Sequence, residues 1–275
     1  WFPPRWAFLC GWISAGPGTD LSGWSLLAGV ILTGPLVCGA SQIVNDWYDQ
    51  DVDALNEPDR PIPSGRVPGK TAFWFAVVWT VIAQTWAILL GPWVAAATGL
   101  GLALAWAYSA PPLRLKMNGW WGNSAVAISY EGLAWITGAA IVIGGDLPAE
   151  PILLIALLYS IGAHGIMTLN DFKSVEGDLA MGIRSLPAQL GPTRAARVAC
   201  LFMLLPQLIV ILLLVRWSLT PFALAVGLVV VTQCLAMRKL LRDPKQFAPW
   251  YNATGVSLYV LGMMAVAIGL GGWLM

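Results

Sequence analysis

The sequence predicts an all-α integral membrane protein in which residues 1–275 form a single transmembrane domain. Of its 275 residues, 58% are hydrophobic and only 11% are charged, and the mean hydropathy is +0.71. A typical soluble domain carries about 25% charged residues, so this composition excludes an ordinary soluble globule. The apolar residues also form long runs, most of them close to the ~20 residues that a helix needs to cross a bilayer.

Nine apolar runs, divided by glycine, proline and charged stretches, are the candidate spans. They lie near 3–19, 23–47, 70–91, 93–110, 121–143, 149–170, 193–215, 220–240 and 253–274. The division at Gly91-Pro92 would also fit a kink within one long hairpin. The first run is the shortest, and the chain begins at Trp1 without a methionine. We therefore expect the natural N-terminus to be missing and judge no targeting segment.

The basic residues decide the predicted orientation. Of the 15 Lys and Arg residues, 13 lie in the connections after the second, fourth, sixth and eighth spans, namely Arg60, Arg66, Lys70, Arg114, Lys116, Lys173, Arg184, Arg194, Arg197, Arg238, Lys239, Arg242 and Lys245. The positive-inside rule makes this face cytoplasmic, so the N-terminus is predicted inside and the C-terminus outside. Cations spread over several loops, with a net charge of +1, indicate no nucleic-acid partner.

Two acidic clusters lie at the cytoplasmic ends of predicted spans. In the first, Asp46, Asp49 and Asp53 fall within about 60° of one another on a continuous helix at 100° per residue. In the second, Asp171 and Asp178 are seven residues apart and would share a face in the same way. Gathered carboxylates are costly unless a cation binds between them, and Mg²⁺ carrying a diphosphate is the candidate.

Basic residues and prolines accompany both clusters. The segment 56–65 contains three prolines and Arg60, which predicts a fixed loop after the first cluster. Lys173 and Arg184 accompany the second. Carboxylates that hold Mg²⁺ beside cations that touch phosphate oxygens would activate a diphosphate leaving group. The apolar span interior would then shelter a carbocation-like chain from water.

Four ordered motifs give the sequence a resemblance to a known family. They are Asn45-Asp46-x-x-Asp49-x-x-x-Asp53, then NEPxRPIPSG over 56–65, YSAPPLRLK over 108–116, and NDFKSVEGD over 170–178. This order resembles the UbiA superfamily of intramembrane prenyltransferases over nearly the whole chain. The resemblance implies the UbiA-type fold, with nine transmembrane helices around a central cavity. Within that superfamily, the residues of these motifs are similar to those of the chlorophyll and bacteriochlorophyll synthases.

The resemblance also implies a reaction and a setting. A geranylgeranyl or phytyl group would pass from its diphosphate to the propionate carboxylate of a chlorophyllide-type tetrapyrrole, and pyrophosphate would be released. The phrases at 129–133 and 162–165 look more like the bacterial branch, which acts on bacteriochlorophyllide. The expected setting is the bacterial inner, photosynthetic membrane, with photosynthetic assembly factors as possible partners by family analogy. Ala134 departs from the family pattern, where we expect proline.

The motif match assigns roles residue by residue. Two Mg²⁺ ions are implied, one held by Asp46, Asp49 and Asp53 with Asn45 in support, and one by Asp171 and Asp178 with Asn170 in support. The diphosphate would be met by Arg60, Lys116 and Lys173. Tyr108 and Glu176, from the third and fourth motifs, are expected at the substrate. Asp51 would point about 140° away from Asp46 and is not expected to be a ligand.

Two polar residues within the spans are further substrate-binding candidates. Glu131 lies about ten residues into the fifth span, roughly 15 Å deep, where a carboxylate is a functional candidate. The alternative is a protonated or hydrogen-bonded core residue. His164 lies seven residues before Asp171 and would project into the cavity above the metal site, as an axial ligand for a tetrapyrrole magnesium. The alternative is a histidine packed against a neighbouring helix.

Other functions remain open at this point. Chlorophyllide could be the acceptor in place of bacteriochlorophyllide, and another UbiA-type enzyme would prenylate a quinone or haem precursor. A secondary transporter would place its charges near the bilayer midplane, whereas here only Glu131 lies deep. A pigment-binding structural protein would need several histidine ligands, and the chain has one.

Overall fold

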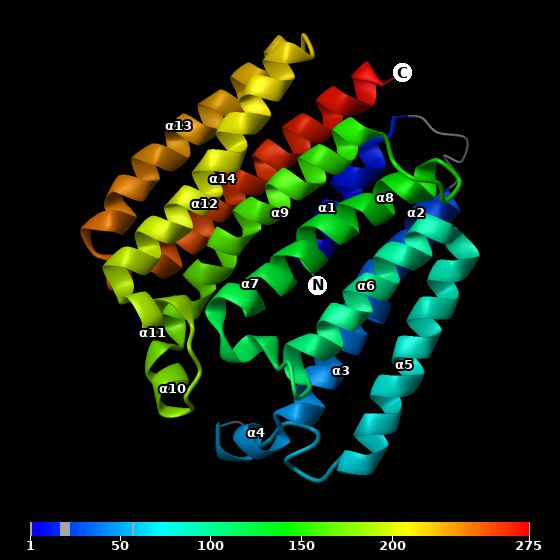
Figure 1. Ribbon diagram of the computed structural model, residues 1–275, viewed down its shortest axis with the longest axis vertical. Coiled ribbons are helices and arrows are strands. Elements are labelled where there is room, and N and C mark those ends of the chain that lie inside the picture. The colour runs from blue at the N-terminus through cyan, green and yellow to red at the C-terminus, as the bar shows by residue number, and fades with distance from the viewer. Residues whose placement is uncertain (1, 17–22, 57, 275) are drawn as a thin grey trace.

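The computed structural model describes residues 2–16, 23–56 and 58–274, and these form a bundle of helices (Figure 1). The long helices are α1 (Phe2–Ser14), α2 (Gly23–Ile31), α3 (Gly39–Tyr48), α5 (Gly69–Leu90), α6 (Pro92–Ser109), α7 (Gly119–Ala127), α8 (Ala134–Val142), α9 (Glu150–Asn170), α12 (Pro192–Arg216), α13 (Thr220–Arg242) and α14 (Pro244–Trp273). Two π-helical turns, η1 (Leu32–Cys38) and η3 (Ile128–Leu133), join α2 to α3 and α7 to α8.

Short elements gather at one end of the bundle, which we call the polar end. They are α4 (Gln50–Asn56), η2 (Leu115–Met117), η4 (Asp171–Lys173), α10 (Val175–Ala180) and α11 (Leu186–Leu190). Figure 1 shows α4, α10 and α11 toward the lower end of the bundle, near the lower ends of α3 and α5. Within the described ranges the chain forms no strand, only an isolated bridge between Asn118 and Arg184. The all-α prediction is therefore confirmed.

Helices occupy all nine predicted positions, but the count of nine membrane spans is not confirmed. Among the described residues, seven helical segments are long and apolar enough to cross a membrane. Neither α1, with 13 residues, nor α6, with 18, belongs to that set. The predicted end of the first span, at 17–19, lies outside the described residues. Gly91, at φ 128°, separates α5 from α6, so the Gly91-Pro92 division is a true helix boundary.

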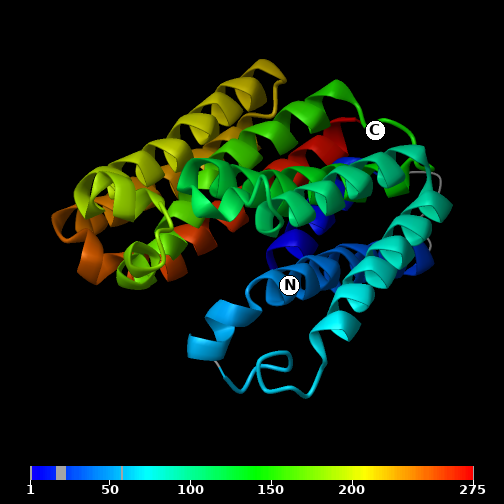
Figure 2. The same cartoon turned by 60° about the horizontal axis from the view of Figure 1, so that its bottom comes forward.

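The long helices form two packed groups that share α1 and α8. One core cluster joins α9, α12, α13 and α14, and a second joins η1, α3, α5 and α6. Both include residues of α1 and α8, such as Cys10 and Trp135 in the first and Phe8 and Ile141 in the second. Figure 2 shows α5 at the outer margin of the bundle, and only 17% of the residues in its apolar stretch are buried. The two groups therefore meet along a central seam.

Candidate active site

The first acidic cluster is held together by an arginine from the loop that follows it. One terminal nitrogen of Arg60, Nη1, lies 3.3 Å from Asp46 Oδ1 and 2.9 Å from Asp53 Oδ2. The proline-rich segment 58–68 turns the chain back so that Arg60 reaches both carboxylates. Arg60 therefore neutralises carboxylates that come from two helices, α3 and α4.

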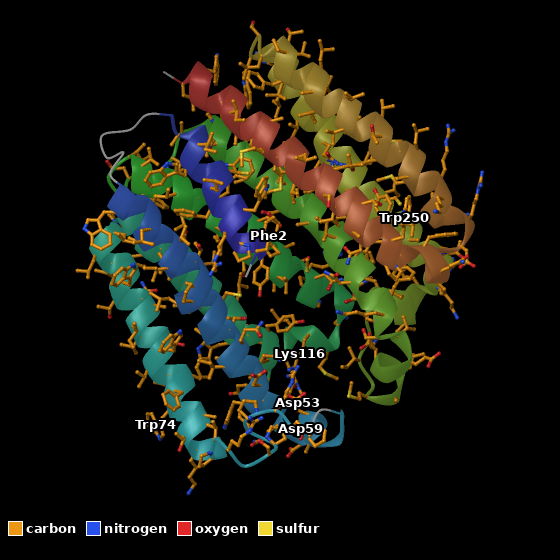
Figure 3. The ribbon with its side chains drawn as sticks, turned by 180° about the vertical axis from the view of Figure 1, so that it is seen from behind. Phe2, Asp53, Asp59, Trp74, Lys116 and Trp250 are labelled. Atoms are coloured by element: carbon orange, nitrogen blue, oxygen red, sulfur yellow. The ribbon has the colours of Figure 1, made fainter. Side chains whose placement is uncertain are left out.

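A lysine from a second loop holds the remaining carboxylate of this cluster. Lys116, on η2, donates to Asp49 Oδ1 and to Asn45 Oδ1, the latter at 3.3 Å. Arg114 Nη2 also lies 3.8 Å from Asp49 Oδ1. Ser109 Oγ donates to Asn45 Oδ1 at 3.2 Å, so the amide oxygen of Asn45 faces this loop. Lys116 and Asp53 lie close to one another at the polar end in Figure 3.

The second acidic cluster is held by neutral side chains. Asn123, on α7, donates from Nδ2 to Asp171 Oδ2 at 3.0 Å, and Ser174 Oγ donates to Asp178 Oδ2 at 3.1 Å. Asn252, on α14, donates to Asn170 Oδ1. Neutral donors leave the charge on Asp171 and Asp178 in place, and neither carboxylate forms an ion pair with a lysine or arginine among the described residues.

The helices break within both clusters, which corrects the predicted geometry. The helix α3 ends at Tyr48, and Asp49 follows at φ −101° and ψ 6° before α4 begins. On the other side α9 ends at Asn170, so Asp171 lies on η4 and Asp178 on α10. The prediction that each cluster lies on one face of a continuous helix is therefore wrong. The carboxylates of the first cluster are brought together by Arg60 and Lys116.

The two clusters lie at one site because the loops beside them are tied together. Gly119 N donates to Arg184 O at 2.8 Å, and Arg184 N donates to Met117 O at 3.0 Å. These bonds join the loop that carries Lys116 to the loop that follows Asp178. Tyr108, at the end of α6, lies within electrostatic reach of Asp49, Asp171 and Asp178, and it lines one cavity together with Asn45 and Asn170.

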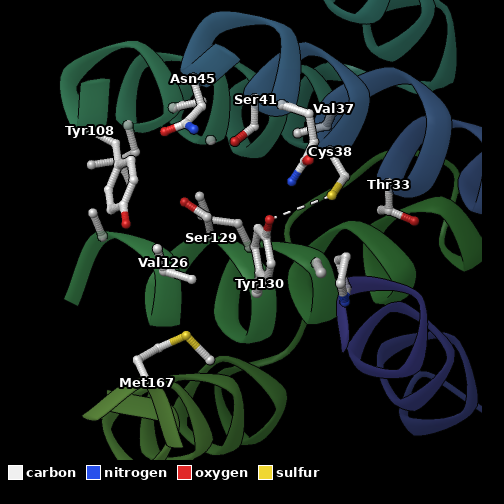
Figure 4. Close-up of a pocket in the computed structure, with 18 of the residues that line it drawn as sticks. Thr33, Val37, Cys38, Ser41, Asn45, Tyr108, Val126, Ser129, Tyr130 and Met167 are labelled. Atoms are coloured by element: carbon white, nitrogen blue, oxygen red, sulfur yellow. Dashed lines mark hydrogen bonds between the residues drawn. The ribbon is translucent and has the colours of Figure 1, made fainter. Parts of the chain in front are cut away.

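A cavity of about 540 Å³ opens beside the clusters and extends into the bundle. At the polar end it is lined by Asn45, Tyr108, Asn123, Asn170, Asp171 and Lys173. Farther in, it runs between η1, α6, η3 and α8 and is lined mainly by small and apolar side chains (Figure 4). Its volume lies within the range of pockets that bind one small molecule. The site therefore combines a charged mouth with an uncharged interior, in which small and apolar side chains alternate with hydroxyl groups such as those of Thr33, Thr98 and Thr137.

Three of the predicted substrate residues do not line this cavity. Glu131 is buried in η3, and Glu176 is exposed on α10. His164 is buried between α7 and α12, where its ring stacks on Phe202 at 4.4 Å between centroids. Its Nδ1 lies 3.2 Å from Ser124 Oγ, while Nε2 has no hydrogen-bond partner among the described residues. The expectation that His164 projects into the cavity is not supported, and its pigment role stays a prediction.

Three residues of the site went unassigned in the sequence analysis. Arg114, which lies beside Asp49, belongs to the motif over 108–116, so its position in that motif could have marked it as a site residue. Asn123 and Asn252 lie alone on helices far away in the sequence, so no local pattern marks them. Among the residues that the structure describes, no three Asp, Glu, His or Cys side chains lie close enough together to hold a metal ion. The carboxylates of the first cluster contact Arg60 and Lys116.

Helices around a cavity with acidic clusters at its mouth define a class of membrane-embedded enzyme, and the chain belongs to the UbiA prenyltransferase family. The model of that family matches residues 6–256. The chain is also 54% identical over 275 residues to the bacteriochlorophyll synthase 33 kDa chain of Cereibacter sphaeroides, covering 99% of this chain and 90% of that protein. Chlorophyll synthase of Avena sativa is 35% identical, with 98% and 73% covered.

Solved structures share the fold. One of digeranylgeranylglyceryl phosphate synthase has a TM-score of 0.78 at 18% identity and covers 98% of this chain and 93% of that chain. A UbiA homologue from Archaeoglobus fulgidus bound to GPP and Mg²⁺ has a TM-score of 0.67 at 18% identity, with 94% and 95% covered. The UbiA-type fold predicted from the motifs is therefore confirmed.

The Lys116–Asp49 contact leads to a testable titration. Burial lowers the pKa of Lys116, and the contact with Asp49 opposes that effect. Asp49→Asn removes the opposing charge, so the pKa of Lys116 should fall further below its ordinary value. Lysine labelled with ¹³C at Cε, titrated by NMR in metal-free detergent buffer, reports this pKa, and Lys116→Arg identifies the signal. Asp51→Asn is the matched control, and an equal fall in both variants would contradict the assigned contact.

Proposed function

We propose that this protein is a magnesium-dependent bacteriochlorophyll synthase, which transfers a geranylgeranyl or phytyl group to the propionate carboxylate of bacteriochlorophyllide. The observation that carries this proposal is the meeting of two acidic clusters at the mouth of one apolar cavity. The names of the relatives at 54% and 49% identity support this acceptor over the quinone and haem precursors. The likeness to chlorophyll synthases at 35% identity keeps chlorophyllide as the second candidate.

The donor set at the mouth fits Mg²⁺. Five carboxylates and two amide oxygens supply the hard oxygen ligands that this ion prefers, from Asp46, Asp49, Asp53, Asp171, Asp178, Asn45 and Asn170. These residues would hold Mg²⁺, as two ions in this proposal, and the metal would neutralise the charge that develops on the departing diphosphate. Arg60 and Lys116 would exchange their contacts with the first cluster for phosphate oxygens, together with Lys173, which already lines the cavity.

Beyond binding the diphosphate, the proposed transfer needs few further groups from the protein. An oxygen of the acceptor carboxylate attacks C1 of the prenyl group while the bond from C1 to the diphosphate oxygen breaks, and pyrophosphate leaves. A propionate is already ionised near pH 7, so no strong base is required. The apolar cavity keeps water from the electron-poor prenyl carbon. A volume of about 540 Å³ suits the prenyl chain alone, so the macrocycle would approach the mouth from outside the cavity.

The orientation of the site and the pigment contacts are part of the same proposal. We propose that the polar end faces the cytoplasm in the bacterial photosynthetic membrane, and the basic loops at that end support this orientation through the positive-inside rule. His164 and Glu131 remain candidates for contact with the pigment, and Glu176 lies exposed beside the second cluster. Contact of His164 Nε2 with a macrocycle would require the Trp120 and Phe202 rings to move, because His164 is 3% exposed. Photosynthetic assembly factors are possible partners.

Single carboxylate substitutions test the proposed roles of the two clusters. Asp46→Ala and Asp171→Ala should each reduce the rate of esterification by roughly 100-fold or more, because each removes a group that stabilises the leaving diphosphate. Asp51→Ala is the matched control, since Asp51 is an exposed acid of the same segment. Rates are measured on purified protein that remains monodisperse in detergent. Full activity of either cluster variant would contradict the two-cluster site.

A competition assay tests the proposed acceptor. Purified protein receives Mg²⁺, geranylgeranyl diphosphate and equal amounts of chlorophyllide a and bacteriochlorophyllide a, and chromatography separates the esters. The expected product is the bacteriochlorophyllide ester. Preferential esterification of chlorophyllide would keep the reaction and change the acceptor. If neither ester forms while prenyl diphosphate still binds, the tetrapyrrole acceptor is wrong.

A further inference from the structure

Three residues from different helices meet the cavity at one depth below its mouth. Cys38 lies seven residues before Asn45, Gly101 lies seven before Tyr108, and Tyr130 lies seven after Asn123. The second member of each pair lines the cavity at the polar end. Seven helical residues are about two turns, or ~10 Å. Cys38, Gly101 and Tyr130 therefore form a level of the cavity about two turns beneath the acidic clusters, which we call the constriction.

The constriction includes the one contact drawn across the cavity in Figure 4. Tyr130 OH lies 3.5 Å from Cys38 Sγ, with Asn45 and Tyr108 toward one end of the cavity and Thr33 toward the other. Both residues belong to π-helical turns, Cys38 to η1 and Tyr130 to η3. Such turns are rare and occur frequently at functional sites. Here they aim the phenol and the thiol at each other from opposite walls.

The cavity continues past the constriction. Thr33, Thr98 and Thr137 line it at greater depth, together with apolar and small side chains such as Leu133. Gly101, on α6, lines the same cavity without a side chain. A Cβ added there would lie 3.7 Å from Leu133 Cδ1 and 4.0 Å from Val37 Cγ1, which are ordinary contacts. The cavity thus has an upper compartment at the mouth and a lower compartment beneath the constriction.

We propose that the constriction selects prenyl diphosphates by chain length, with Tyr130 as the residue that decides. This inference rests on the proposed binding of a prenyl diphosphate in the cavity and is independent of the acceptor. A short chain such as geranyl ends within the upper compartment. A geranylgeranyl chain passes between Tyr130 and Gly101 and gains the apolar contacts of the lower compartment. The Tyr130 hydroxyl is held by Cys38 and by the Gln42 side chain, so movement of the ring breaks a weak contact with a thiol and one hydrogen bond with an amide.

Blocking the passage is the first arm of the test. The dissociation constants of geranyl and geranylgeranyl diphosphate are measured with Mg²⁺ and without tetrapyrrole, by calorimetry on the full chain in detergent. Gly101→Leu fills the passage without a backbone clash and should raise the ratio of the geranylgeranyl Kd to the geranyl Kd by about tenfold or more, as expected for apolar groups excluded from a pocket. Geranyl binding shows that the variant is folded.

Opening the passage is the second arm. Tyr130→Ala removes the ring and should lower the same ratio, whereas Tyr130→Phe keeps the ring and reports the joint contribution of the hydroxyl contacts with Cys38 and Gln42. Val126→Ala, which lines the cavity one turn nearer the mouth, is the matched control and should leave the ratio unchanged. A ratio that stays constant in Gly101→Leu and Tyr130→Ala would overturn the length selection and leave the proposed function standing. Failure of the wild-type protein to bind either diphosphate would overturn both.

Discussion

The need to neutralise negative charge at the end of an apolar helix bundle governs the architecture of this protein. Asp46 lies in the last turn of α3, Asp49 between α3 and α4, and Asp53 within α4. Arg60 and Lys116 reach these carboxylates from two separate loops. Each carboxylate is thereby paired, which lowers the cost of placing it beside hydrocarbon. The pairing also ties the proline-rich loop and the loop after α6 to the first acidic cluster. A ligand that brings both magnesium and phosphate can replace these pairs without leaving any charge unpaired.

Helical geometry then converts distance along the sequence into depth in the cavity. The polar residues at the mouth and those of the constriction differ by seven positions on three separate helices. Because each residue adds 1.5 Å, a single heptad separates the polar residues at the mouth from those of the constriction. Under the proposed function, these two levels would provide one environment for a highly charged leaving group and another for hydrocarbon. This separation suits the proposed reaction, which releases a water-soluble leaving group and forms a lipid-soluble product.

Much of the fold and part of the site can be predicted from the sequence, because hydropathy and motif spacing are local signals. The nine helical positions and the convergence of two acidic clusters are of this kind. Helix breaks at Asp49 and Asp171 are set by the loops that hold the carboxylates, so helical periodicity misplaces them. The partners Asn123 and Asn252 depend on tertiary packing. Helical periodicity also predicts the wrong surroundings for His164. The side of α9 that carries His164 packs against α7 and does not face the cavity.

The central claim is that both acidic clusters act on one diphosphate through bound metal. Anomalous diffraction from crystals grown with Mn²⁺ and a non-reactive thiolo analogue of geranylgeranyl diphosphate tests it directly. The account predicts manganese beside Asp46 and Asp49 and beside Asp171, with the diphosphate between them and Arg60 moved onto a phosphate oxygen. Manganese at one cluster alone, with Arg60 still bound to Asp46 and Asp53, would contradict it.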